Sequence, residues 1–336
     1  MPEELPFNPV AILGAVLLLG GAVQLLRWLG TGGPQGGPER TYPGFLLVNL
    51  AAVLPELVMA VTALALSDFR LAEGVVAASV LWRLGLCGLL GMALPTGRNP
   101  MLPGRSLANL LPAVAVVASI LALVAAILRA PHPNDPTRRL LAVATVLAPY
   151  LGCLWLVWRI GLESKGEPPA GSDPDLPGGP AARPGSRRAL GSALAVVAGG
   201  VLFAWAVHGS LWMLTAAHGA NPAWRSYPRH VLLMVGALPA LPGAYVAWRE
   251  RRREAAGLRP TRELLACPTL LVTLELMGLG PAGNSDVIGS VAILGVLAGG
   301  ALAALFAPVE RFVPAPVRGL AMLLTALGML TLAWRS

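Results

Sequence analysis

Apolar residues occur along this chain in long runs that are separated by short polar segments. A helix that crosses a membrane needs about 20 largely apolar residues. Ten runs meet this requirement, at residues 8–29, 43–67, 71–95, 107–129, 139–160, 189–216, 229–248, 262–280, 285–307 and 316–334. The pattern therefore predicts an all-α, polytopic membrane protein with ten transmembrane helices.

The segment between the fifth and sixth runs has a different composition. Residues 161–188 are rich in Gly, Pro and charge, which disfavours an ordered core. We therefore expect a first five-helix repeat over residues 1–160, a flexible linker over residues 161–188 and a second five-helix repeat over residues 189–336. Because five is an odd number, the second repeat would be inverted in the membrane.

Composition agrees with this assignment and adds an orientation. Hydrophobic residues make up 55% of the 336 residues and charged residues only 12%, which excludes a water-soluble globule. Seventeen of the 25 Lys and Arg residues lie in one set of alternate loops and seven in the other, with Arg83 inside a run. The basic side faces the cytoplasm. We expect a multi-pass protein of the inner (plasma) membrane with both termini outside and a cytoplasmic linker.

The basic excess thus indicates orientation, and we expect no nucleic-acid partner. The first run follows an acidic leader, so it is expected to be retained as a spanning helix rather than removed as a signal. The three cysteines all lie inside predicted spans, which favours neither a disulfide framework nor a zinc site. No cofactor is expected.

The second helix of each predicted repeat contains a proline in a similar setting. Residues 54–63 align with residues 238–247, with Leu, Pro, Leu, Ala and Ala at the same positions. A proline inside a helix frees the carbonyl oxygen four residues before it. Breaks at Pro55 and Pro239, matched in two inverted halves, point to a binding site at the membrane midplane. The alternative is that both prolines only kink their helices for packing.

At these residues the chain resembles the cation/calcium (sodium/calcium) exchanger superfamily. The residues Leu54-Pro55-Glu56-Leu57 are similar to the Ser-x-Pro-Glu-type helix of its alpha repeats, and the run from Ala72 to Ser79 is similar to the start of its third helix. The resemblance in topology covers the whole chain, and the resemblance in motifs covers about four helices. It implies that Glu56 is a cation ligand at the membrane centre, with Ser79 where the family has asparagine.

The second alpha repeat departs from the family pattern. Ala240 stands where the second glutamate is expected, and Val53 and Ala237 replace serines. Since Ca²⁺ takes six to eight oxygen ligands, often with several carboxylates, one glutamate would hold it poorly. The resemblance therefore supports the fold better than it supports calcium exchange.

Three ionisable residues lie well inside the predicted spans: Glu56, Arg83 and Glu275. Each costs roughly 2.5 to 3.5 kcal/mol at the bilayer centre. Counted from the short turn near residue 69, Glu56 and Arg83 are each about 20 Å deep, so they can meet. Two hypotheses follow. Glu56 exchanges a cation for a proton while Arg83 competes as a counter-ion, or the two form a static salt bridge. A nearby arginine would keep the site almost neutral and disfavour divalent cations.

Other candidate residues have two interpretations each. Thr269 and Thr273 are candidate cation ligands, although such threonines often bond their own helix backbone. Glu275 is either a displaced acid of the second repeat, in a counter-ion or gating role with the two prolines, or a residue that reaches the interface.

For three further ionisable residues we favour a role outside the binding site, although His208 could also be a proton relay. We expect His208 to be packed in the core and Asp68 and Glu73 to be solvated by water at helix ends.

The sequence predicts a secondary active transporter, a cation antiporter (Ca²⁺ or Na⁺ against H⁺ or Na⁺) with its site around Glu56 and with reduced or lost ion binding. Its partners would be an inorganic cation or proton and the bilayer. Alternatives are a ten-helix transporter of the drug/metabolite type, which would have cytoplasmic termini, or a non-transporting protein that keeps the exchanger fold. An enzyme is not expected, because the spans contain no paired acids and no histidine cluster. The oligomeric state is not set by the sequence.

Overall fold

The computed structural model describes residues 9–30, 41–93, 105–129, 135–163, 186–218, 227–250, 259–277, 287–306 and 313–335. Most of the predicted linker, residues 164–185, lies outside these ranges. The described residues form eleven helices: α1 (Pro9–Gly30), α2 (Tyr42–Ala52), α3 (Leu54–Ala65), α4 (Phe69–Ala93), α5 (Arg105–Arg129), α6 (Pro136–Glu163), α7 (Ser186–His218), α8 (Tyr227–Glu250), α9 (Arg259–Leu276), α10 (Val287–Phe306) and α11 (Ala315–Arg335). Each predicted run contains one helix, except the second, which contains α2 and α3.

Several of these helices have the length and composition of membrane spans. Among the described residues, α1, α4, α6, α7 and α11 are long and apolar enough to cross a bilayer, and α2 with α3 would make a sixth crossing that is bent by 65°. The apolar parts of α5, α8, α9 and α10 are shorter. Large apolar side chains such as Leu140 and Trp212 are about two-thirds exposed, at 70% and 66%. This all-helical chain therefore has the character of a membrane-embedded protein.

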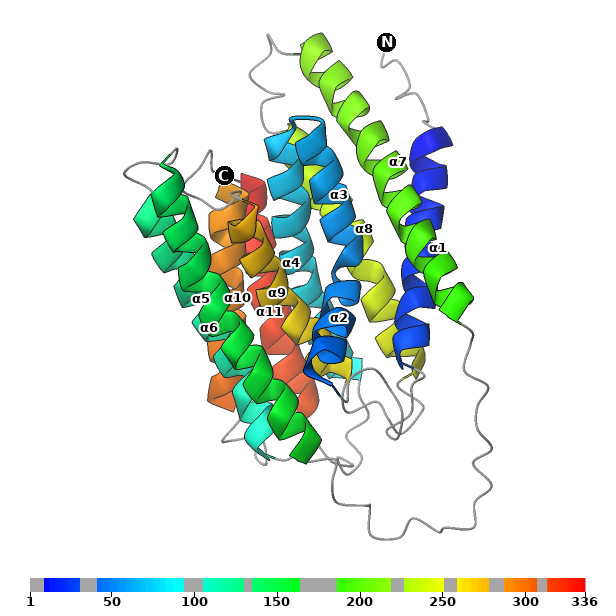
Figure 1. Cartoon of the computed structure of the whole chain (residues 1–336). Coiled ribbons are helices and arrows are strands. Elements are labelled where there is room, and N and C mark those ends of the chain that lie inside the picture. The colour runs from blue at the N-terminus through cyan, green and yellow to red at the C-terminus, as the bar shows by residue number, and fades with distance from the viewer. Residues whose placement is uncertain are drawn as a thin grey trace.

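Helix α4 lies at the centre of the bundle. It packs against α3, α8, α9, α10 and α11, and it is the most buried of the five long apolar helices. Helix α1 packs mainly against α7, and this pair meets the other helices chiefly through α3 and α8. Figure 1 shows α1 and α7 side by side at one edge of the bundle and α5 and α6 at the opposite edge. Side chains on α4 are therefore shielded from lipid in most directions.

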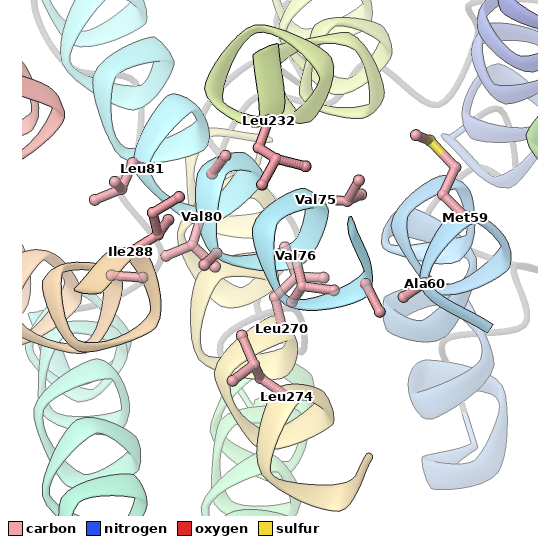
Figure 2. Packing of buried hydrophobic residues seen from close by; sticks show 14 of the residues in the cluster. Met59, Ala60, Val75, Val76, Val80, Leu81, Leu232, Leu270, Leu274 and Ile288 are labelled. Carbon is pink, nitrogen blue, oxygen red and sulfur yellow. The ribbon is translucent and has the colours of Figure 1, made fainter. Parts of the chain in front are cut away.

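The hydrophobic core surrounds α4 on its α3, α8, α9 and α10 sides, as Figure 2 shows. Aliphatic residues, many of them alanines, make up most of this core, and those labelled in the figure are almost fully buried. The labelled members are Met59, Ala60, Val75, Val76, Val80, Leu81, Leu232, Leu270, Leu274 and Ile288. Since lipid tails are as apolar as these side chains, close packing rather than the hydrophobic effect holds the helices together.

Glycine permits the close approach of α1 to α7. A Cβ added to Gly199 of α7 would overlap the main-chain nitrogen of Leu18 and lie 2.7 Å from the main-chain oxygen of Gly14, both in α1. Backbone atoms at such distances leave no space for a side chain. The seam between α1 and α7 is thus a small-residue contact of the kind that drives helix association in bilayers.

This seam gives a prediction about stability. Gly199→Ala should lower the melting temperature of the purified protein in detergent, because the new methyl group must push α1 away from α7, at about 1–3 kcal/mol. Gly209→Ala is the matched control in the same helix, since nothing lies within 4 Å of a Cβ at that position. The control should be neutral or slightly stabilising. Equal effects of the two substitutions on thermal unfolding, followed by tryptophan fluorescence, would contradict the close contact.

Candidate ion-binding site

A sharp break in the second predicted span positions the candidate site. Helix α2 ends at Ala52 and α3 begins at Leu54, with the two axes bent by 65° around Val53. Pro55 fits the first turn of α3, because the N–H that proline lacks would have no partner there. Glu56 follows in the same first turn. The partial positive charge of a helix N-terminus favours a carboxylate at this place.

Glu56 is fully buried and forms an ion pair with Arg83 of α4. The Oε1 atom of Glu56 accepts hydrogen bonds from Arg83 Nη2 at 2.7 Å, from Arg83 Nε at 2.9 Å and from the Ser79 hydroxyl at 2.7 Å. The relative exposures of Glu56, Arg83 and Ser79 are 0%, 1% and 0%. The expected meeting of Glu56 and Arg83 is therefore confirmed, and Ser79 joins them because it lies one helical turn before Arg83.

The break between the helices also supplies a carbonyl oxygen. Arg83 Nη2 donates to the main-chain oxygen of Ala52 at 2.9 Å. Ala52 is the last residue of α2, and the last carbonyls of a helix have no partner within that helix. In a continuous helix, Pro55 would free the carbonyl oxygen of Ala51, which lies four residues before it. Because α2 has ended before Pro55, the oxygen that Arg83 uses belongs to the next residue.

The two oxygens of Glu56 have different surroundings. While Oε1 receives three donors, Oε2 is buried and has no hydrogen-bond partner among the described residues. A buried carboxylate oxygen without a donor is unfavourable, since it has lost its water. The site thus has one saturated oxygen and one open acceptor.

Helix α8 of the second predicted repeat reaches this site without a carboxylate beside Ser79. Helix α8 continues through Pro239 and Pro242, so no second break occurs there. Gly236 of α8 packs so tightly that an added Cβ would overlap Ala78 Cβ and lie 3.0 Å from the main-chain nitrogen of Ser79. Ala240, the residue that aligns with Glu56 in the second predicted repeat, is fully buried. The face of α8 beside Ser79 is therefore backbone and methyl groups.

The hydroxyl groups of the two threonines predicted as cation ligands are bonded to backbone carbonyls of their own helix. Thr269 donates to the Leu265 carbonyl at 2.7 Å and lies 2.6 Å from the Tyr150 hydroxyl of α6. Thr273 donates to the Thr269 carbonyl at 2.8 Å. None of these hydrogen bonds reaches Glu56. The pattern matches the backbone-bonded interpretation of both threonines.

Two other glutamates are more buried than the sequence indicated. Glu73, in the second turn of α4, is only 5% exposed, and its Oε1 lies against Gly289 of α10. The expectation that water solvates Glu73 is wrong, because α10 covers the start of α4. Glu275 is 2% exposed, so protein rather than an aqueous interface surrounds it.

The structure also reveals a contact that sequence reasoning missed. His208 Nδ1 of α7 lies 2.7 Å from Asp68 Oδ2 in the turn between α3 and α4. Asp68 Oδ1 accepts the Leu71 N–H at 2.9 Å, which caps α4, and Ser67 has a φ of 59° at the end of α3. The expectation that water solvates Asp68 is wrong, because His208 contacts its carboxylate. The side chain of His208 therefore links α7 to the turn between α3 and α4 and is not simply packed in the core. Its partner is distant in the chain, so no local signal could have identified the pair.

Comparison of the chain with protein-family models and with curated proteins found no match in either set. The function is therefore inferred from the geometry of the site.

The Glu56–Arg83 pair gives a prediction from a double-mutant cycle. Glu56→Met and Arg83→Met should each destabilise the protein by about 3–5 kcal/mol, because each leaves an uncompensated buried charge. The double variant should recover most of this loss, since it leaves no unpaired charge at this site. Thermal unfolding in detergent measures all three proteins. If the single effects simply add in the double variant, the two charges are not a coupled pair.

The Asp68 cap gives a separate prediction. Asp68→Ala should lower stability by about 0.5–2 kcal/mol, because α4 loses its cap. Asp68→Asn can still accept the Leu71 N–H, so it should lose less. The same thermal assay measures both, and equal losses would show that the cap contributes nothing beyond the charge.

Proposed function

We propose that this chain is a secondary active transporter, a cation antiporter whose midplane site is built around Glu56. The observation that carries the proposal is the buried, ion-paired Glu56 at the break between α2 and α3. An ionisable side chain in the interior of a membrane protein marks a pathway for an ion or proton. Broken helices at such a site are a feature of transporters, because the break exposes carbonyl oxygens to the cargo.

The helix contacts support an arrangement of two inverted repeats. Suppose that α1, α2–α3, α4, α5 and α6 correspond to α7, α8, α9, α10 and α11. If each helix is replaced by its equivalent in the other half, a contact in one half should have a counterpart in the other. The contact between α3 and α7 then corresponds to that between α8 and α1, and the contact between α5 and α9 corresponds to that between α10 and α4. In the same way, the contact between α5 and α6 corresponds to that between α10 and α11, and the contact between α4 and α11 corresponds to that between α9 and α6. All of these pairs are in contact.

The same correspondence supports the proposed resemblance to the cation/calcium exchanger superfamily. In this arrangement α4 and α9 are equivalent and in contact, and Glu56 and Ser79 lie on the elements that would hold a cation. The basic loops would face the cytoplasm, with the linker there and both termini outside, in the plasma membrane. Alternating access would expose Glu56 to one side of the membrane and then to the other.

One observation favours a second candidate, a non-transporting membrane protein that keeps this fold. Arg83 donates two hydrogen bonds to Oε1 of Glu56 and one to the Ala52 carbonyl, so the ion pair could act as a static link between α3 and α4. The two candidates differ in one respect: a transporter must release Glu56 from Arg83 during its cycle, and a static link must not.

Ion flux in proteoliposomes tests the proposal. The full chain is reconstituted with an imposed pH or Na⁺ gradient, and the movement of ²²Na⁺, ⁴⁵Ca²⁺ and protons is recorded. We expect gradient-driven, saturable exchange of at least one cation, lost in Glu56→Gln and retained in Thr273→Ser, which keeps the hydroxyl of a backbone-bonded residue. Absence of flux for all three ions in a correctly folded sample would favour the non-transporting candidate.

A further inference from the structure

The oxygen atoms around the Arg83 guanidinium are of the kinds that bind metal ions. Its Nη2 lies 2.7 Å from Glu56 Oε1 and 2.9 Å from the Ala52 carbonyl oxygen, and the Ser79 hydroxyl bonds the same Oε1. Carboxylate, carbonyl and hydroxyl oxygens are hard ligands that suit Na⁺ and Ca²⁺. A nitrogen of the protein therefore lies between the Glu56 carboxylate oxygen and the Ala52 carbonyl oxygen, in the place that a bound cation would take, and the Ser79 hydroxyl bonds the same carboxylate oxygen.

We propose that Arg83 is a tethered cation that fills the cation position of the Glu56 site and restricts its exchangeable cargo to a single positive charge, a proton or a monovalent cation. The identity of this cargo rests on the proposed function; the occupation of the site by Arg83 does not. Arg83 is then the residue that makes the site select monovalent over divalent cations.

The charges at the site explain this restriction. Glu56 and Arg83 together are neutral, so a proton or monovalent cation leaves the buried group with a net charge of one, and a divalent cation leaves it with two. The desolvation penalty of a buried ion rises steeply with its charge. The open Oε2 of Glu56 offers one further ligand, which suits a proton or a weakly held monovalent ion better than Ca²⁺.

The neighbouring helix offers no compensation for a second charge. Helix α8 reaches Ser79 through Gly236, and Ala240 presents only a methyl group. Trp82 donates to the Leu233 carbonyl at 2.8 Å, which fixes α4 against α8 in this close register. A carboxylate from α8 could therefore balance a divalent ion only if the residues of α8 were changed.

The test measures cation binding separately from transport. Wild type, Arg83→Lys, Arg83→Gln and the double variant Arg83→Gln with Glu56→Gln are purified as full chains in detergent. Their melting temperatures are recorded with added NaCl or CaCl₂, and with choline chloride as the control for ionic strength. A ligand that binds only the folded protein raises this temperature.

We expect Arg83→Gln to be stabilised by Ca²⁺ and Na⁺ beyond the effect of choline, because removal of the guanidinium frees the oxygens. Wild type and Arg83→Lys, which keep a positive charge, should gain nothing from Ca²⁺. The double variant should lose the response, since it lacks the carboxylate. A folded Arg83→Gln that does not respond, or an Arg83→Lys that responds equally, would overturn the proposal.

Equilibrium binding of ⁴⁵Ca²⁺ to the unmodified chain provides a second measurement that does not depend on the folding of any Arg83 variant. We expect no saturable binding to wild type. Saturable binding that Glu56→Gln abolishes would overturn the proposal.

The two proposals can fail separately. Cation binding gained in Arg83→Gln without any flux in wild type would uphold the tethered cation and reject transport. Flux of ⁴⁵Ca²⁺ in wild type that depends on Glu56 would uphold transport and reject the tethered cation.

Discussion

The ion pair between Glu56 and Arg83 is the constraint on which the rest of this structure depends. Two charges inside a membrane protein are costly unless they are paired with each other and hydrogen-bonded. Here the guanidinium bonds one carboxylate oxygen twice and a carbonyl oxygen once, and Ser79 bonds the same carboxylate. These groups come from three helices: the carbonyl from α2, the carboxylate from α3, and Ser79 and Arg83 from α4.

The local architecture positions these groups for the ion pair. The bend between α2 and α3 supplies the Ala52 carbonyl and places Glu56 at a helix N-terminus, so one irregular segment provides two oxygens to Arg83. The short turn between α3 and α4 sets Glu56 and Arg83 at the same depth. Asp68 holds that turn by capping α4 and by contacting His208 of α7. The central position of α4 keeps the pair away from lipid.

Much of this arrangement could be predicted from the sequence because it depends on local patterns. Apolar runs of sufficient length predicted the helices, and counting residues from the α3–α4 turn predicted that Glu56 and Arg83 would meet. The contact between His208 and Asp68 could not be predicted, since it joins distant segments. Nor could the burial of Glu73, which depends on how α10 packs against α4. The matched prolines predicted two breaks, but α8 stays continuous through Pro239. A helix inside a membrane protein tolerates a proline where neighbouring groups can satisfy the backbone atoms that the proline frees.

The central claim is that Glu56 is ionised and held by Arg83 in the resting protein. Difference infrared spectroscopy between wild type and Glu56→Gln at neutral pH measures this charge directly, because ionised and protonated carboxyl groups absorb at separate frequencies. The account predicts that wild type shows the carboxylate bands of Glu56 and no protonated carbonyl band from it. A protonated carbonyl band that disappears in Glu56→Gln would contradict the account.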